Sequence, residues 1–349
     1  TLGNYIVALP VVSSASYTGQ GQPNPKILPV DFDNDGDMDL LITRVRPQGE
    51  ESYNKVRLLR NEDLYEFTVV DIAPEIACSS HTATWGDFTG NGYMDLAVSY
   101  NIVGGQALDN YTWIYDNVGG VFTRRQNSSA RVGQGIDAHA ADFNNDGRLD
   151  MLVSGYYGLH GQDAVAAFWQ RENGTFQDYR ALPLLNRGIT SIGDFNNNGA
   201  MDIAIAYWST QYISEPFRTY RNVIGTPNEP PTAPDGLEAT VGSGNLVTFK
   251  WNPATDDNTP ADSLTYNLDV WRLDTPEISV VPPMADRETG WRRIPAHGNA
   301  GMKTDDGTGK RTWSIRIFEP GNYGWTVQAI DASFTGGPWA EPYGAFTVE

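Results

Sequence analysis

The chain has 349 residues, of which 40% are hydrophobic and 11% aromatic, and its formal net charge is −19. This length is sufficient for two domains of ordinary size. The negative charge repels nucleic-acid phosphates and anionic lipids, so we expect no nucleic-acid partner. No apolar run reaches the roughly 18 residues that a membrane span needs, so we expect none.

The 36 glycines and 21 prolines favour strands joined by turns, and we expect an all-β protein. The single cysteine, Cys78, excludes an intramolecular disulfide framework, so stability must come from core packing or from bound metal. The chain begins at Thr1 rather than at a methionine. We therefore expect that an upstream segment, such as a secretion signal, has been removed.

A nine-residue acidic motif occurs four times, starting at Asp31, Asp87, Asp142 and Asp194. Each copy has Asp at position 1, Phe at 2, Gly at 6, Met or Leu at 8 and Asp at 9. Positions 3 and 5 always carry a side-chain oxygen. The starts are 56, 55 and 52 residues apart, and four such matches at this spacing are very unlikely to arise by chance.

Each motif is followed by a short apolar run, which indicates a strand buried on both faces. One strand before the motif and two strands after the apolar run, joined by a Gly/Asn turn, complete a unit of four strands. A period in the fifties with four strands per unit is typical of a β-propeller blade.

The four motifs resemble FG-GAP repeats, which form the calcium-binding blades of integrin α propellers and of many secreted bacterial proteins. The resemblance covers residues 1–224 and implies an extracellular or cell-surface protein of a bacterium. Propellers of that family commonly have seven blades, whereas four can be counted here.

The two ends of the repeat region bear on closure of the propeller. The fourth repeat ends at "FRTYRNVIGT" without its last strand, and the N-terminal "LGNYIVALP" is similar to the outer strand "NGTFQDYRALP" of the third repeat. We therefore expect the N-terminal strand to complete the last blade and close a four-bladed propeller. Residues upstream of Thr1 could instead carry further blades, which would make this region part of a larger propeller.

The loops predict up to four structural Ca²⁺ sites, because oxygen-only ligand sets suit a hard cation that takes 6–8 ligands. Side chains would contribute at positions 1, 3, 5 and 9, and the backbone carbonyl at position 7. The predicted ligand residues are Asp31, Asp33, Asp35, Asp37 and Asp39; Asp87, Thr89, Asn91, Tyr93 and Asp95; Asp142, Asn144, Asp146, Arg148 and Asp150; and Asp194, Asn196, Asn198, Ala200 and Asp202.

The charge of each loop predicts an order of affinity, since affinity rises with ligand charge. The first loop, with four ligand carboxylates, should bind most tightly, followed by the third, with the second and fourth weakest. The side chain of Asp37, at position 7, should be dispensable. The alternative, most credible for the second and fourth loops, is that they are metal-free turns held by Asp and Asn hydrogen bonds. We also expect the residues at positions 2 and 8 to anchor every loop in the core.

Aromatic residues follow the apolar strands, on the rim opposite the acidic loops. Exposed aromatic rings with polar tips suit stacking on sugars or anchoring a protein partner, although they could instead pack between blades. The candidate ligand-binding residues are Tyr100, Tyr156, Tyr157, Tyr207, Trp208 and Tyr212. His81 and His139 lie near the inner strands, where we expect hydrogen-bonded structural roles.

A second domain follows a proline-rich linker at 225–231. Residues 232–349 resemble a fibronectin type III β-sandwich. Trp251 lies on the second strand, and Tyr323, after a "PGN" turn, takes the place of the tyrosine corner.

These features favour a secreted or surface-attached, calcium-stabilised protein that acts in adhesion, glycan binding or extracellular assembly. Its partner would be an extracellular glycan or protein, or further copies of itself. The alternatives are an extracellular polysaccharide lyase or hydrolase, and a structural subunit of a filament or sheath. No Ser/His/Asp, Cys/His or paired-Glu arrangement is evident in the sequence, which favours the non-enzymatic interpretation.

Overall fold

The computed structural model describes residues 26–45, 55–62, 66–70, 72, 78–102, 110–127, 132–157, 162–179, 188–207, 217–292, 294–301 and 308–349. Strands dominate this part of the chain, and its one helix is a 3₁₀ turn at Ser243–Asn245. The prediction of an all-β protein is confirmed. Among the described residues, no helix is long and apolar enough to cross a membrane.

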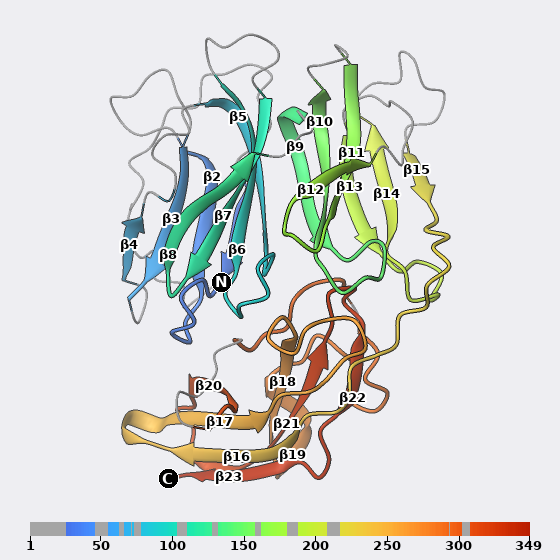
Figure 1. Cartoon of the computed structure of the whole chain (residues 1–349). Helices are drawn as coiled ribbons and strands as arrows, with labels where there is room; N and C mark the ends of the chain where they lie inside the picture. The colour runs from blue at the N-terminus through green and yellow to red at the C-terminus, as the bar shows by residue number, and fades with distance from the viewer. Residues whose placement is uncertain are drawn as a thin grey trace.

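The repeat region forms four small antiparallel sheets, one for each acidic motif (Figure 1). Within each sheet, strands that are consecutive in sequence pair with one another. The first sheet contains β1 (Ile27–Val30), β2 (Asp39–Val45), β3 (Lys55–Asn61) and β4 (Phe67–Val70); the second β5 (Cys78–Gly86), β6 (Asp95–Ile102), β7 (Asn110–Val118) and β8 (Val121–Asn127); the third β9 (Val132–Ala141), β10 (Asp150–Tyr157), β11 (Gln162–Gln170) and β12 (Phe176–Tyr179).

The fourth sheet has three described strands, β13 (Gly188–Gly193), β14 (Asp202–Tyr207) and β15 (Phe217–Tyr220). The unit of four strands is thus confirmed for three repeats, and the last repeat lacks its outer strand within the described residues, as the sequence predicts. The segment expected to supply that strand, "LGNYIVALP", lies outside the described residues.

Successive sheets pack face to face around three hydrophobic cores. Residues from the first and second sheets form one core, those from the second and third another, and those from the third and fourth the last. Strands between two cores are buried on both faces, so Leu96, Ala97 and Val98 of β6 are each at most 3% exposed. The apolar runs of β6 and β10 therefore have the two-sided burial that their sequence predicts, whereas Leu40 and Ile42 of β2 and Ile203 of β14, at the ends of the array, are half-buried.

The two ends of this array depart from the prediction that loop positions 2 and 8 are always buried. Phe32, Phe88 and Phe143 are each 3% exposed, whereas Phe195 at the same position of the last sheet is 54% exposed. Met38, in the first loop, is 45% exposed. The first three phenylalanines are each covered by the following sheet, and no described core joins the fourth sheet to the first.

An amide side chain at the end of the third strand connects neighbouring sheets. The Nδ2 group of Asn117 donates to the Phe32 carbonyl of the preceding sheet at 2.6 Å. Gln170 makes the same connection to Phe88 at 2.6 Å, and Asn222 to Phe143 at 2.8 Å. Among the described residues, the equivalent Asn61 donates from its side chain within its own sheet, to the Met38 carbonyl at 3.4 Å.

This difference predicts unequal costs for two matched substitutions. Asn117→Ala should lower the free energy of unfolding by about 1–3 kcal/mol, because it leaves a buried carbonyl unpaired. Asn61→Ala removes only a long, exposed bond and should cost clearly less. Urea unfolding of both variants measures the difference, and equal losses would show that the connection between sheets contributes no stability.

Two further sheets form a C-terminal sandwich (Figure 1). One has the order β16-β17-β20, and the other the order β19-β18-β21-β22, with β23 also paired to β21. The strands are β16 (Asp235–Val241), β17 (Leu246–Asn252), β18 (Thr265–Arg272), β19 (Thr275–Val281), β20 (Arg311–Arg316), β21 (Gly321–Ile330), β22 (Gly336–Trp339) and β23 (Gly344–Val348).

Large aromatic side chains fill the core between the two sheets of the sandwich. Trp251 on β17, Tyr266 on β18 and Trp325 on β21 are each 0% exposed. The Tyr323 hydroxyl donates to the Glu319 carbonyl, four residues upstream, at 2.7 Å. This is the bond that defines a tyrosine corner, so the role predicted for Tyr323 is confirmed.

Candidate metal centre

The carboxylate at loop position 1 organises the backbone of each acidic loop. One of its oxygens accepts a hydrogen bond from the amide of position 5 and the other from the amide of position 6, at 2.7–3.3 Å in all four copies. The side chain at position 5 accepts in turn from the amide of position 7, at 2.9–3.2 Å. The glycine at position 6 has φ between +76° and +103°, a region that favours glycine.

The carboxylate at loop position 9 connects the loop to the third strand of its sheet. In the first, third and fourth loops it accepts from the amide of position 2, and in the second from the amide of position 3, at 2.9–3.2 Å. Its other oxygen accepts from the backbone amide of Asn61, Asn117, Gln170 or Asn222, at 2.6–2.8 Å. These amide-bearing residues follow position 1 by 28 to 30 residues, a regularity of the sequence that lies outside the nine-residue motif.

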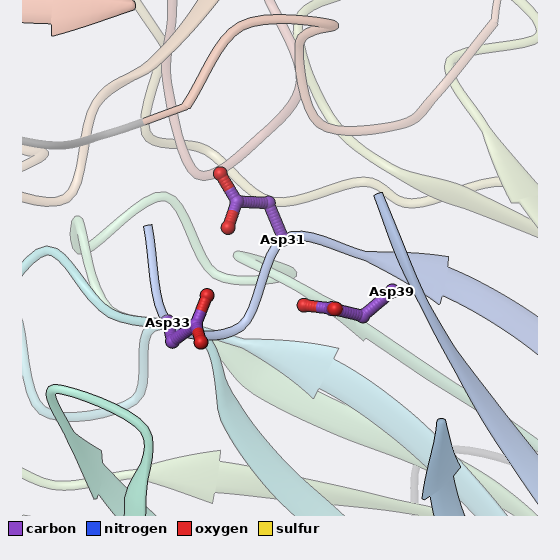
Figure 2. Close-up of side chains that lie close together, drawn as sticks. All are labelled: Asp31, Asp33 and Asp39. Carbon is purple, nitrogen blue, oxygen red and sulfur yellow. The ribbon is translucent and has the colours of Figure 1, made fainter. Parts of the chain in front are cut away.

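The first loop gathers three carboxylates around one point (Figure 2). Oxygens of Asp31, Asp33 and Asp39 all lie within 4.8 Å of one another, and this is the one such group among the described residues. Asp33 Oδ1 is buried and has no hydrogen-bond partner. An oxygen-only set with an unsatisfied buried oxygen fits a divalent cation. Asp35, also predicted as a ligand, is not part of this close group.

Burial and mutual repulsion raise the pKa values of these carboxyl groups. Burial is the larger cause for Asp31, followed by its acidic neighbours, and together they raise its pKa to about 8. Burial also raises the pKa of Asp39 to about 7. Holding these groups ionised at neutral pH is therefore unfavourable unless a positive charge lies among them.

Arginine side chains supply part of that positive charge. Arg60 Nε lies 3.0 Å from Asp33 Oδ2. In the third loop the Arg148 guanidinium pairs with Asp146, so the side chain at position 7 contacts a predicted metal ligand. The sequence predicts that position 7 contributes through its backbone carbonyl alone, and this side-chain pairing goes beyond that prediction.

The other three loops contain hydrogen bonds between the side chains of predicted ligands, whereas Asp31, Asp33 and Asp39 of the first loop bring three carboxylates together. In the second, Thr89 Oγ1 donates to Asp95 Oδ2 at 3.0 Å. In the third and fourth, Asn144 donates to Asp146 and Asn196 to Asp202, both at 2.9 Å. These bonds are of the kind expected for turns that hold their shape without metal. The geometry thus distinguishes the first loop, which the sequence predicts to bind most tightly.

The metal-free protein should lose stability as pH rises. Carboxylates with lowered pKa values have the opposite effect, because they stabilise the folded state as pH rises. A group whose pKa is higher in the folded than in the unfolded state favours folding below its folded pKa, and this contribution is lost as pH rises through that value. The relevant folded values are about 8 for Asp31 and about 9 for Asp150, where burial is the main cause. In chelator, the melting temperature should be lower at pH 9 than at pH 6. A higher value at pH 9 would contradict this.

All four acidic loops lie against the C-terminal sandwich or the segment that leads to it (Figure 1). A Cβ built on the position 6 glycine of the first, third or fourth loop would contact the carbonyl oxygen of Ser314, Asn258 or Asn228, respectively. In the second loop, Gly90 abuts the Ser263 hydroxyl.

The third loop makes the most extensive of these contacts. The Asp142 amide donates to the Ala332 carbonyl at 2.9 Å, and Ser333 Oγ donates to Asn145 Oδ1 at 3.0 Å. The ring of His297 packs against Phe334, and burial lowers the pKa of His297 to about 4. The third loop therefore faces protein rather than open solvent, whereas residues 195–198 of the fourth loop are exposed.

This contact predicts different effects of alanine at two equivalent glycines. Gly147 and Gly199 have φ values of +83° and +76°, so the backbone strain of an added Cβ is similar. A Cβ at Gly147 would lie 1.8 Å from the Asn258 carbonyl oxygen, whereas the nearest atom to one at Gly199 is at 3.5 Å. Gly147→Ala should therefore cost about 1–3 kcal/mol more than Gly199→Ala in chemical unfolding. Similar costs would argue against tight packing of the third loop on the sandwich.

For the aromatic residues predicted to bind a ligand, the structure describes at most the backbone. Tyr100, Tyr156, Tyr157 and Tyr207 belong to β6, β10 and β14, towards the strand ends farthest from the acidic loops. Their side chains, and the whole of Trp208 and Tyr212, fall outside the described positions. The structure therefore places four of the backbones at the predicted rim and leaves the binding role untested.

The histidine on the inner strand of the third sheet has the structural role that the sequence predicts. His139 Nε2 lies 3.0 Å from the Thr190 carbonyl oxygen. On the same strand, the Asp137 carboxylate accepts from the Thr190 amide at 3.0 Å and pairs with Lys26. These contacts connect the inner strands of the third and fourth sheets with the start of the first.

Comparison with known proteins supports the repeat assignment for part of the chain. Residues 31–98, from the first acidic loop to β6, match the model of the FG-GAP-like repeat family. No significant match to a curated protein was found. Among solved structures, domains A168–A170 of titin match with 12% identity and a TM-score of 0.23, over 93% of this chain and 98% of that chain. A TM-score this low carries no inference about fold or function.

Proposed function

We propose that the chain is an extracellular or cell-surface binding protein whose FG-GAP-type blades are stabilised by calcium. The observation that carries the proposal is the first loop, where three carboxylates lie within 4.8 Å of one another. FG-GAP repeats are typical of extracellular proteins, and calcium is abundant outside cells. Asp31, Asp33 and Asp39 would hold the ion, and the remaining loops would bind more weakly or serve as hydrogen-bonded turns.

The position of the loops favours a structural over a catalytic metal. A catalytic ion needs an open coordination position that converges on substrate. Here the loops lie against the sandwich, and the carboxylates at positions 1 and 9 are occupied by backbone amides. When bound, calcium would neutralise the loop carboxylates. A role in adhesion, glycan binding or assembly is therefore the better proposal, with a polysaccharide-degrading enzyme as the alternative.

The proposed architecture is a four-bladed propeller at 1–224, a linker at 225–231 and a fibronectin type III-like sandwich at 232–349. Within the described residues β15 pairs with β14 alone, so its outer edge could receive the N-terminal strand. The sandwich covers the loop end of the sheets. The opposite end, where the aromatic residues lie, would then be the face for a glycan or protein partner.

Two substitutions in the first loop test the metal assignment. Asp33→Asn and Asp37→Asn each remove one negative charge, but only Asp33 belongs to the close carboxylate group. Asp33→Asn should weaken calcium binding at least about tenfold in calorimetric titration, since affinity depends on ligand charge. Asp37→Asn should change it little. Equal losses would indicate a diffuse charge effect, and no calcium binding by the unmodified chain would overturn the proposal.

A pair of assays separates the binding protein from the enzyme. A glycan array probed with the calcium-loaded chain should show retention of specific glycans. Incubation with acidic polysaccharides should release no unsaturated products, whose absorbance is easily monitored. Unsaturated or shortened products would replace the proposed binding role with a lyase or hydrolase.

A further inference from the structure

Each end of the array of four sheets has an apolar face that no described core covers. On the first sheet, Ile27 pairs with Ile42, neither belongs to the core between the first and second sheets, and Ile27 is 60% exposed. On the fourth sheet, Ile189 and Phe217 both pair with Ala206 and therefore share a face, and they are 65% and 57% exposed. Apolar residues that gather on one exposed face often mark an interaction site.

Sheets inside the array bury the same kind of face. The second and third sheets each lie between two cores, and Leu96, Ala97 and Val98 of β6 are each at most 3% exposed. The first and fourth sheets each contribute to a single core among the described residues. Their apolar strands are thus of the two-sided type but are covered on one side.

The amide connection between sheets shows which partner such a face takes. Asn117 donates to the Met94 carbonyl of its own sheet at 3.0 Å and to the Phe32 carbonyl of the preceding sheet at 2.6 Å. Asn222 makes the same two bonds in the fourth sheet, at 3.2 Å and 2.8 Å. Each side-chain amide therefore uses its two N–H donors on two neighbouring sheets.

The first sheet has the donor side of this connection and the fourth sheet the acceptor side. Among the described residues, the Asn61 amide makes the bond within its own sheet, to Met38 at 3.4 Å, without the bond to a preceding sheet. Phe195 occupies the loop position of Phe32, and its side chain is 54% exposed. The two end faces are therefore complementary sides of an interface that the chain already contains three times.

We propose that the fourth sheet of one chain packs against the first sheet of a second copy. Asn61 of the second copy would donate to the Phe195 carbonyl, and the faces that carry Ile27 and Phe217 would cover one another. Because two different faces meet, the contact is heterologous, and it produces a ring if the rotation closes or an open row if it does not. A strand added to the edge of β15 would leave this face uncovered.

The occupant is argued from the interfaces within the chain. The fourth sheet offers the same combination of loop phenylalanine, its carbonyl and apolar strands that the first three sheets offer to their followers. The first sheet is the remaining sheet of this type with an uncovered face, and no described core joins it to the fourth sheet of its own chain. The inference rests on the proposed function for its assembly role and names the partner.

Sedimentation velocity of the full, calcium-loaded chain over a range of concentrations tests the proposal. The unmodified chain should form dimers or larger assemblies whose share rises with concentration. Ile27→Asp and Phe217→Asp each place a charge on one of the two faces and should weaken assembly at least about tenfold, because an unpaired charge is costly to bury. Phe318→Asp is the matched control, since Phe318 is 70% exposed on the sandwich, and it should assemble as the unmodified chain does.

A mixture of the two variants tests whether two different faces meet. Ile27→Asp keeps the face of the fourth sheet and Phe217→Asp that of the first, so an equimolar mixture should form dimers at concentrations where neither variant does alone. Thermal melting checks that the substitutions, all at exposed positions, leave the fold intact. A chain that stays monomeric, as it would if its own first and fourth sheets packed together, would overturn the proposal. Assembly that neither variant weakens, or a mixture without dimers, would also overturn it. Calcium titration and the glycan array judge the proposed function separately.

Discussion

The structure of the repeat region depends on loop carboxylates that accept hydrogen bonds from backbone amides. In every copy, position 1 shapes its own loop and position 9 connects the start of that loop to the third strand of the sheet. The residue whose amide position 9 accepts also sends its side chain to the preceding sheet, in the second, third and fourth sheets. One short motif thus fixes a turn, a strand pair and a contact between sheets.

These carboxylates are stabilising only if their charge is compensated. In the second, third and fourth loops, side-chain hydrogen bonds from Thr89, Asn144 and Asn196 supply part of the compensation. In the first loop Arg60 neutralises Asp33 in part, and the half-buried Asp31 and the buried Asp39 have raised pKa values. Calcium is proposed to complete the balance there. Because the loops contact the sandwich, the compensation of their charge also affects how the sheets pack on the sandwich.

Much of the architecture could be predicted because it is encoded locally. The repeat, its four strands and the burial of β6 and β10 follow from residue types at fixed spacing, as does the Tyr323 hydrogen bond. The exposure of Phe195 and Met38 could not be predicted from the motif. It depends on whether a neighbouring sheet packs against these residues. The contact of the loops with the sandwich is likewise a product of tertiary structure. The pairing of Arg148 with Asp146 is local, between residues two apart in the sequence, but it depends on the conformation of the loop. The amide side chains that connect neighbouring sheets could have been predicted from the sequence, because each follows the first aspartate of its motif by 28 to 30 residues.

Hydrogen exchange with and without calcium tests the central claim most directly, since it reports on individual backbone amides. The account predicts that chelation speeds exchange at the amides of positions 5 and 6 of the first loop, at the Asn61 amide and in the sandwich segment that the first loop touches, around Ser314. The core of the sandwich, at Trp325, should keep its protection. Exchange that is unchanged by chelation throughout the first loop would contradict the claim that a cation holds these carboxylates together.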